Sequence, residues 1–392
     1  MSFTSCNLVG VPRRDKSSLM ARDRAGPTAW EIHSSQIVSG STQLSQHSQV
    51  FGNDPPDWMW RPMEYVARAL YAVRYDDAFF SPEWGIVFPK SAVFLDDSAN
   101  AARYKSPDLS QVYGFYDGEK SPCFSINRGD GNYFTGTFLV LNHWGSKNFG
   151  HFIFDSLLGV FIFLSEIMRG ELKILTPPLR EWQKVFLNRM GISDSAIQEV
   201  NAETCRCERV IFPGSLCDNL NFPSPITRAM LDYMKLSGEG QSKINAPRRI
   251  YVSRKKYDNR QMLNESELIS ALNNLGFINI CPEDYSIDQQ IEIFSGSEII
   301  VGEIGAALSN IAFTDRSCHV IEIIPELKPS VWIKNLCSLL NLKWTSVYCK
   351  VPEEFRTVSV VDGIEYNNLI FSYNVSVDDV ISAVKSSILD MT

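Results

Sequence analysis

Residues 248–325, RRIYVSRKKYDNRQMLNESELISALNNLGFINICPEDYSIDQQIEIFSGSEIIVGEIGAALSNIAFTDRSCHVIEIIP, decide the fold of this chain. Four short apolar runs in this stretch predict β-strands, at 250–253, 277–281, 299–301 and 320–324. Each run is followed by polar or glycine-bearing residues, as expected where a buried strand ends in a loop.

Helical patterns lie between the predicted strands. Apolar residues spaced three and four apart at 268, 269, 272 and 275 predict a helix that ends at Gly276. Ser286 with Gln289 three residues later is typical of the start of a second helix, and Leu308 and Ile311 continue a third. Strands that alternate with helices predict an α/β fold with a parallel sheet covered on both faces.

In such sheets, ligands bind outside the carboxyl ends of the strands. Positive charge after the first strand suits a diphosphate, small residues after the third allow close backbone approach to an anion, and carboxylates near the second and fourth suit ribose hydroxyls. Each feature alone has an ordinary structural explanation, but their coincidence at successive strand ends favours a nucleotide site. The candidate residues are Arg254, Lys255, Arg260, Glu283, Gly302, Glu303, Gly305, Ala306, Ala307 and Glu322.

At these positions the chain resembles glycosyltransferase family 61 and the related bacterial capsular polysaccharide biosynthesis proteins. The matching C-terminal motifs are 251–254, 260 with 263–265, 276–277, 282–283, 301–302 with 305–310, and 320–322. An upstream element also matches, with Asn148, His151 three residues later and then Asp155. The resemblance covers about residues 135–390 and adds Asn310 to the donor-binding candidates.

The resemblance implies a GT-B architecture, in which two Rossmann-like domains face each other across a cleft. It further implies an inverting transfer of a hexosyl or pentosyl group from a nucleotide-sugar donor to a glycan or lipid-linked glycan acceptor. Neither a cofactor nor a metal ion is expected to be required, and Asp96-Asp97 and Asp378-Asp379 have no convincing metal-ligand partners. Surface polysaccharide synthesis, of the capsular or lipopolysaccharide type, is the implied process.

His151 and Asp155 are the candidate catalytic residues. Because they are four residues apart, they share one face of a helix that begins near Asn148, and a His-Asp pair can take a proton near neutral pH. The structural alternative is that Asn148 caps the helix and His151 is a core histidine. Which of the pair is the base stays open, and His143 is a third candidate.

One residue departs from the family pattern. The family has a histidine directly before the Gly-Ala pair, where this chain has Ile304. This departure motivates an alternative function, a non-catalytic relative that binds a nucleotide sugar or a glycan. A third possibility, an unrelated nucleotide-cofactor enzyme, is disfavoured because the first strand-to-helix turn lacks Gly-x-Gly-x-x-Gly.

The length of 392 residues predicts two domains. Residues 1–56 are expected to be a poorly ordered or accessory segment, and residues 57–237 an α/β domain on the acceptor side. A linker at 238–242 follows. Residues 245–350 form the Rossmann-like nucleotide-sugar domain, and 351–392 an extension whose helix, capped by Ser376, returns to the first domain.

Composition sets further bounds. A net charge of −8 argues against a nucleic-acid partner. The longest apolar run, 157–164, is too short to span a membrane, so peripheral contact is the membrane interaction left open. Nine cysteines without a paired framework or a zinc spacing fit a reducing compartment. We therefore expect a cytoplasmic protein, with the inner face of the membrane as an alternative location.

Overall fold

The computed structural model of the chain describes residues 132–141, 145–213, 221–237, 246–314, 317–361 and 364–391. Earlier in the chain it describes short segments at 2–6, 13–14, 20, 28–33, 36–39, 50–52, 56–59, 64–67, 70–82, 86–89, 93–95, 116–118 and 121–125. Two compact units are formed, Met1–Gln36 with Ala67–Leu220 and Ile37–Val66 with Asn221–Thr392.

The first unit is built on a mixed sheet with the strand order β14-β13-β12-β15-β7-β3-β2, and β8 pairs with β7. Its parallel part consists of β12 (Tyr133–Val140), β13 (Lys173–Thr176), β14 (Ile197–Glu199) and β15 (Cys205–Pro213). The remaining strands are β7 (Leu70–Ser81), antiparallel to β15, with β3 (Thr28–His33), β2 (Arg13–Arg14) and β8 (Ile86–Pro89). A smaller sheet contains β10 (Tyr116–Gly118), β11 (Ser121–Ser125), β1 (Ser2–Cys6) and β9 (Val93–Leu95).

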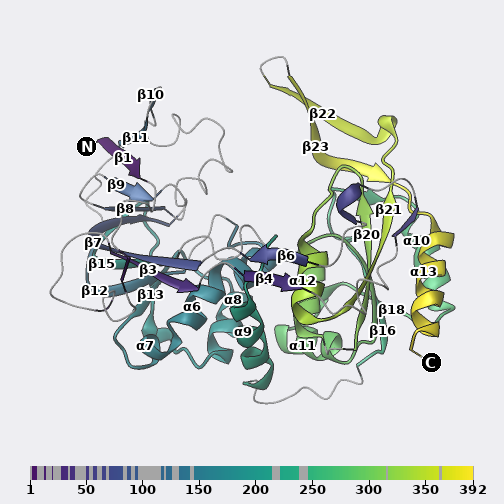
Figure 1. The fold of residues 1–392 in the computed structure, drawn as a ribbon, viewed down its shortest axis with the longest axis horizontal. Coiled ribbons are helices and arrows are strands. Elements are labelled where there is room, and N and C mark those ends of the chain that lie inside the picture. The colour runs from purple at the N-terminus through teal and green to yellow at the C-terminus, as the bar shows by residue number, and fades with distance from the viewer. Residues whose placement is uncertain are drawn as a thin grey trace. The chain divides into compact units, whose positions relative to one another are not determined.

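The helices of the first unit connect its parallel strands (Figure 1). Between β12 and β13 the chain forms α5 (Phe149–His151), the π-helix η3 (Phe152–Leu157), α6 (Leu158–Ile162) and α7 (Leu164–Met168). Between β13 and β15 it forms α8 (Glu181–Arg189) and η4 (Asp194–Ala196). The apolar run at 157–164 is therefore part of an interrupted helix, and no helix among the described residues is long and apolar enough to cross a membrane.

The second unit contains a six-stranded sheet in the order β18-β16-β19-β20-β21-β5, and all of its pairings are parallel. The strands are β16 (Arg249–Val252), β18 (Ile278–Ile280), β19 (Ile299–Glu303), β20 (His319–Pro325), β21 (Lys343–Cys349) and β5 (Val50–Gly52). The four strands expected from the sequence are confirmed to within two residues at each end. β21 and β5 were not expected.

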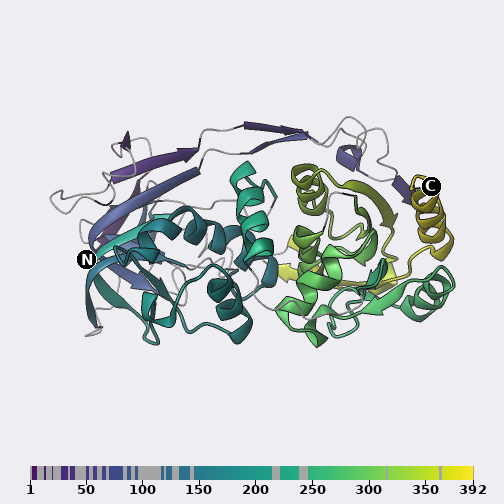
Figure 2. The ribbon, with the colours of Figure 1, turned by 90° about the horizontal axis from the view of Figure 1, so that it is seen from below.

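Helices cover both faces of this sheet (Figure 2). One face carries α10 (Glu265–Asn273) and α13 (Val377–Leu389), whose side chains share a core with alternate residues of β19 and β20. The other elements are α9 (Pro225–Leu236), α11 (Ile287–Ser295), α12 (Trp332–Leu340) and the 3-10 helices η2 (Asp57–Met59), η5 (Pro282–Asp284), η6 (Ala306–Phe313) and η7 (Glu353–Phe355). The mixed α/β fold with parallel sheets and helices is thus confirmed.

The capping predictions hold at three helices. Ser286 and Gln289 form a reciprocal capping box at α11, Ser376 accepts from the amide of Asp379 at α13, and Gly276 follows α10 with a φ of +79°. The predicted third helix differs, because residues 306–313 form a 3-10 helix. Its hydrogen bonds are poorer than those of an α-helix, which weakens the helix-dipole argument for an anion at its start.

The last part of the chain adds a small sheet of β17 (Gln261–Met262), β23 (Ile364–Tyr373) and β22 (Arg356–Val361). β17 pairs with β23, so that Met262 lies opposite Tyr373. The final helix, α13, packs on β20, β21 and β5 of the same unit and contributes Val380 and Val384 to its core. The expected return of this helix to the first domain stays a prediction, because among the described contacts α13 covers a face of the sheet in its own unit.

The two units also divide the chain differently from the expected domains. The helix α9, placed in the N-terminal domain by the sequence analysis, belongs to the second unit, where Arg228 donates to the carbonyl oxygen of Leu339 and Lys235 to that of Thr314. The two-stranded sheet of β4 (Gln36–Ser39) and β6 (Glu64–Ala67) lies where the chain passes between units. The predicted linker at 238–242 and much of 1–56 lie outside the described residues.

A carboxylate lies inside the core of the second unit. Glu322, in the middle of β20, has no exposed surface, and its Oε2 accepts a hydrogen bond from Trp344 Nε1 at 2.9 Å. Its Oε1 has no partner among the described residues. Burial raises the pKa of Glu322 to about 8. Glu322 in the unfolded chain loses its proton near the ordinary pKa of 4.5, whereas in the folded chain it keeps the proton up to about pH 8. Between these two pH values, stability falls as pH rises.

We expect Glu322→Gln to reduce the loss of stability that occurs as pH rises. The unfolding free energy of the wild type should fall between pH 5 and pH 8 relative to that of the variant, by on the order of 3 kcal/mol, because ionising a buried carboxylate costs free energy. Urea unfolding at both pH values measures this difference. Glu354→Gln, at an exposed position, is the control. Parallel pH profiles for wild type and Glu322→Gln would contradict the prediction.

Candidate functional site

In the parallel sheet of the second unit, the order in which the chain adds strands reverses between β16 and β19. β16 leads to β18 on one side of it, and β19 leads to β20 on the other, while β16 and β19 are themselves hydrogen-bonded neighbours. In open α/β sheets, ligands bind outside the carboxyl ends of the strands at such a point. Arg254 lies two residues after β16, and Glu303 is the last residue of β19. The topology therefore brings these two predicted site residues together.

Arg254 lies across the turn that follows β19. Its Nη1 donates to the carbonyl oxygen of Ile304 at 2.8 Å, and its Nη2 donates to Oδ1 of Asn259 at 3.1 Å. The guanidinium carbon lies 5.5 Å from the ring centre of Tyr257, within the range of a cation–π interaction. A Cβ at position 305 would collide with the guanidinium. Gly305 is therefore required for the arginine to take this position.

Arg260 is the second arginine of the site. Its backbone has a φ of +57°, which is uncommon for a residue other than glycine and carries a conformational cost. Its side chain is only 9% exposed, and its guanidinium forms no hydrogen bond with any described residue. Burial, followed by the nearby charge of Arg254, lowers the pKa of Arg260 to about 10. Its Nε is buried and has no hydrogen-bond partner among the described residues.

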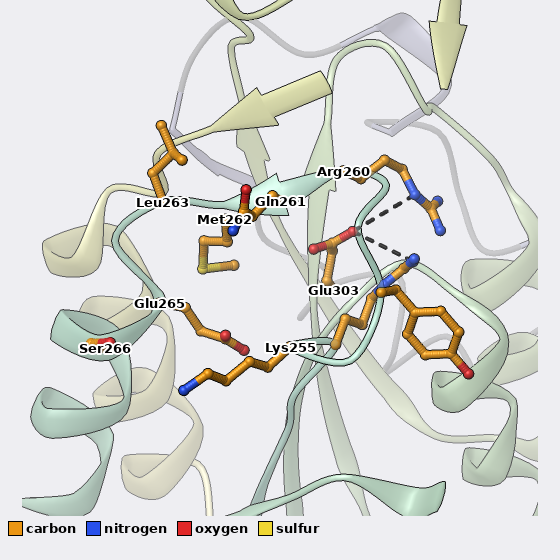
Figure 3. A pocket seen from close by; sticks show the side chains of 10 residues that line it. Lys255, Arg260, Gln261, Met262, Leu263, Glu265, Ser266 and Glu303 are labelled. Carbon is orange, nitrogen blue, oxygen red and sulfur yellow. Dashed lines mark ion pairs between the residues drawn. The ribbon is translucent and has the colours of Figure 1, made fainter. Parts of the chain in front are cut away.

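Glu303 lies between the two arginines. Its Oε1 is 3.5 Å from Nη1 of Arg254 and 3.9 Å from Nε of Arg260, and its Oε2 accepts a hydrogen bond from the hydroxyl of Tyr373 at 2.8 Å. Figure 3 shows the Glu303 carboxylate and the Arg260 guanidinium facing each other. Burial raises the pKa of Glu303 to about 7, although both guanidinium groups oppose this shift.

These residues line a pocket with a volume of about 160 Å³. Its second carboxylate is Glu265, whose Oε1 accepts hydrogen bonds from the hydroxyls of Tyr251 at 3.0 Å and Ser253 at 2.7 Å. The pocket is polar and carries both signs of charge. Its lining consists of Arg254, Lys255, Tyr257, Arg260, Gln261, Met262, Leu263, Glu265, Ser266 and Glu303.

The other predicted donor-binding residues occupy varied positions. Lys255 is exposed and lines the pocket. Glu283 is exposed, does not line it, and accepts a hydrogen bond from the Tyr257 hydroxyl at 2.7 Å. Glu322 lies in the core, as described above. The structure thus groups the residues after β16 with the end of β19, and leaves both of the carboxylates expected for ribose outside the pocket.

The small residues after β19 contribute to packing. A Cβ at Gly302 would press on Leu308 and on Val252 of the adjacent strand. Ala306 and Ala307 begin η6 and are partly exposed. Asn310 is buried, and its Nδ2 donates to Oε1 of Gln290 at 3.0 Å and to the carbonyl oxygen of Ala307 at 3.1 Å, which ties η6 to α11.

Sequence reasoning missed several residues of the site. Tyr257 and Glu265 lie within stretches already identified as the charged loop and the first helix, but neither was chosen. Lys328 follows β20 at the same edge of the sheet, and burial together with the charge of Arg260 lowers its pKa. Tyr373 could have been suggested only by the pairing of β17 with β23, which no local pattern predicts.

In the first unit, the order in which the chain adds parallel strands reverses in the same way between β12 and β15. β12 leads through α5 and η3 to β13 on one side, and β15 lies on its other side. The helical segment that follows β12 therefore begins at a topological switch point. Asn148 caps it by accepting from the amides of Gly150 at 3.1 Å and His151 at 3.4 Å.

His151 and Asp155 form a pair in this segment. The imidazole Nδ1 lies 2.8 Å from Oδ2 of Asp155, and the side chains are 15% and 0% exposed, respectively. Asp155 lies inside the π-helix, a conformation frequent at functional sites, and its Oδ1 is buried without a hydrogen bond to a described residue. A Cβ at Gly145 would collide with the imidazole. The histidine is thus clamped between a glycine turn and a buried carboxylate.

The remaining candidates are placed less fully. His143 and the Asp96-Asp97 pair lie outside the described residues, whereas Asp378 and Asp379 lie in the first turn of α13. Among the residues that the structure describes, no cluster of three or more His, Cys, Asp and Glu side chains could hold a metal ion.

Comparison with known proteins places part of the chain in a described family of domains. Residues 149–321 match the family described as Glycosyltransferase 61. The matched segment begins at Phe149, the first residue of α5, and it includes the pair His151 and Asp155. It also includes Arg254, Arg260 and Glu303. A glycosyltransferase 61 domain supports a transferase that acts on a sugar donor and an acceptor. No curated protein matches the chain.

We expect Gly305→Ala to weaken anion binding by displacing the Arg254 guanidinium. Loss of one charge-assisted hydrogen bond corresponds to about a tenfold weaker affinity. Titration calorimetry with pyrophosphate measures the affinity, and the melting temperature reports on folding. Gly170→Ala is the control, because its φ of +73° makes that change strained while no atom lies near the added Cβ. It should lower stability and leave pyrophosphate affinity intact; equal affinities for wild type and Gly305→Ala would refute the steric argument.

Proposed function

We propose that this protein is an inverting glycosyltransferase of the GT-B type that transfers a hexosyl or pentosyl group from a nucleotide sugar. The observation that carries the proposal is the pair Arg254 and Arg260, both at least nine-tenths buried, at the switch point of the second unit. Buried charges are normally paired or hydrogen-bonded. Among the residues that the structure describes, Glu303 is the carboxylate that forms ion pairs with both arginines, and it is too distant for a hydrogen bond to either. A bound diphosphate would supply the missing acceptors.

In this proposal the second unit binds the donor. The guanidinium groups of Arg254 and Arg260 hold the diphosphate and stabilise its charge as the sugar departs, because preorganised cations in a water-poor pocket are more effective than in bulk water. Lys255 extends the positive lining toward solvent. Gly302 and Gly305 serve the donor site through packing and through the position of Arg254. The partly exposed Ala306 and Ala307 are small enough for a ligand to approach the backbone.

The first unit supplies the base. Asp155 holds Nδ1 of His151, and His151 is the more exposed member of the pair, so the imidazole takes the proton and the carboxylate orients it. As the acceptor hydroxyl oxygen bonds to the anomeric carbon, its proton passes to His151. The bond between that carbon and the phosphate oxygen breaks, and the electron pair leaves with the nucleoside diphosphate. The configuration at the anomeric carbon is inverted.

The setting of the reaction rests on the family resemblance. It supports a metal-independent enzyme without a cofactor, a glycan or lipid-linked glycan acceptor, and a role in bacterial surface polysaccharide synthesis at the cytoplasmic side of the membrane. No nucleic acid takes part.

A second candidate function is a non-catalytic protein that binds a nucleotide sugar or a glycan. It is favoured by Ile304, which occupies the position of the family histidine and is buried, with 1% of its surface exposed. Slow hydrolysis of the donor distinguishes the two candidates. An enzyme releases the nucleotide from its sugar conjugate in the absence of an acceptor, whereas a binding protein shows a thermal shift with the conjugate and releases none.

We expect Arg260→Ala to weaken binding of a nucleoside diphosphate sugar by about ten- to a hundredfold. The reason is the loss of one or two charge-assisted hydrogen bonds, each contributing about 1.5–3 kcal/mol. Arg260 forms no hydrogen bond within the described protein, so its removal should cost little stability. Calorimetric titration with UDP-glucose and GDP-mannose measures the effect.

Lys256→Ala is the matched control for Arg260→Ala. Lys256 carries the same charge in the same loop, but it is exposed, pairs with Asp284 and does not line the pocket. Its removal should leave the affinity within about twofold. A comparable loss in both variants would indicate non-specific attraction by the loop, and no loss in Arg260→Ala would exclude the diphosphate role.

We expect Asp155→Asn to reduce transfer by at least about a hundredfold, within the range attributed to general base catalysis, while donor affinity stays unchanged. Asparagine keeps the size of the side chain but no longer stabilises a protonated His151. The rate of sugar transfer or donor hydrolysis, together with calorimetric titration of the donor, separates the two effects. A variant with full turnover would remove the pair from the mechanism.

A further inference from the structure

Glu303 occupies the place between the two arginines that an anionic ligand would need. The carboxylate is 3% exposed and lies 3.5 Å from Nη1 of Arg254 and 3.9 Å from Nε of Arg260. Hydrogen bonds between a guanidinium and a carboxylate are shorter, about 2.7–2.9 Å. Glu303 therefore compensates the charge of both groups without satisfying their N–H donors.

The position of Glu303 is set by the protein. Its alternation with Ile299 and Val301 along β19 directs it to the face that carries α10, and the Tyr373 hydroxyl from β23 holds its Oε2. Its Oε1 forms no hydrogen bond. The ionisable groups that interact with it come from the loop after β16, from β16 itself, from α10, β21 and β23. They are Arg254, Arg260, Tyr251, Glu265, Cys349 and Tyr373.

We propose that Glu303 is an internal counter-ion of the anion subsite, and that a phosphate of the donor binds Arg254 and Arg260 with uptake of one proton by Glu303. This inference rests on the proposed function and specifies how its donor binds. A negatively charged Glu303 and a negatively charged phosphate cannot share two guanidinium groups without repulsion in a site shielded from water. Protonation removes the repulsion, and the two arginines then direct their N–H groups to the phosphate.

The proton is available near neutral pH. Burial raises the pKa of Glu303 to about 7. The pKa of Arg260 stays near 10, and burial holds those of Tyr251 and Tyr373 well above 10, so these groups keep their charge state between pH 6 and pH 8. Glu303 is therefore protonated in most molecules at pH 6 and in about one-tenth of them at pH 8.

The test is calorimetric titration of the wild-type chain with UDP-glucose and GDP-mannose at pH 6, 7 and 8. Both phosphates of these sugars are diesters and lack the ionisation near pH 6 that a phosphate monoester shows. The dissociation constant should rise about tenfold from pH 6 to pH 8, because only the protonated fraction binds. Repeating the pH 8 titration in buffers with different ionisation enthalpies should give an uptake of nearly one proton.

Glu303→Gln provides the matched variant, since the amide keeps the shape and can still accept from Tyr373. It should bind at pH 8 about tenfold more tightly than the wild type and lose the pH dependence. Weaker binding by Glu303→Gln, a persistent pH dependence in it, or no proton uptake by the wild type would overturn the inference. A persistent dependence would assign the titration to another group, such as Lys328, whose pKa burial lowers.

The two proposals fail in different ways. If the wild type and Glu303→Gln bind neither nucleotide sugar at any pH, the proposed donor site itself is wrong. If both bind, with affinities that do not depend on pH, the donor site stands and the role of Glu303 is refuted. Because proton uptake is measured on the wild type, the inference can be refuted even if the variant does not fold.

Discussion

The second unit depends on the electrostatic balance among two buried guanidinium groups and one buried carboxylate at the β16/β19 switch point. Removing charges from water is expensive, so each group of such a cluster needs compensation by its neighbours. Three features of the chain position these groups. Gly305 makes room for Arg254, the left-handed backbone of Arg260 turns its side chain into the cluster, and Tyr373 holds Glu303. These features hold the two guanidinium groups and the carboxylate together at one edge of the sheet.

The cluster also explains why the chain continues beyond residues 149–321. Tyr373 belongs to β23, whose pairing with β17 places Met262 opposite Tyr373 and thereby fixes the segment directly after Arg260. The same part of the chain supplies α13, which covers a face of the sheet. A domain that ended with β20 would lack both the hydroxyl that holds Glu303 and the strand that braces Arg260.

The sequence predicted the parallel core because strands buried on both faces appear as continuous apolar runs, as at 299–301 and 320–324. It also predicted that Arg254, Arg260 and Glu303 lie near one another, since residues at the carboxyl ends of such strands meet at one edge. Tyr373 was out of reach, because its contact with Glu303 joins positions 70 residues apart through a strand pairing. Glu322 was chosen by the same edge argument, but it lies in the middle of β20, where a strand side chain points into the core.

In the first unit, the two sequence interpretations of residues 148–155 turn out to be compatible. Asn148 does cap the helix, and His151 does contact Asp155. The four-residue spacing could indicate that His151 and Asp155 share a helix face, but it could not indicate the π-helix. A single turn with hydrogen bonds between residues five apart depends on the packing around it. That packing includes aromatic contacts of Phe149 and Phe152 with Trp182, which anchor the segment on α8. The pair His151 and Asp155 is thus supported by aromatic residues that have no proposed part in the reaction.

The replacement of the family histidine by Ile304 is best judged by what position 304 does in this fold. The Ile304 side chain is buried, and its contribution to the pocket is its carbonyl oxygen, which accepts from Arg254. Any residue type provides that carbonyl. The positive charge of the pocket comes instead from the loop at 254–260, which is held by Gly305 and by stacking on Tyr257. Losing an imidazole at 304 therefore removes one donor from the turn but leaves the two guanidinium groups in place, and the ability to bind an anion should outlast the change.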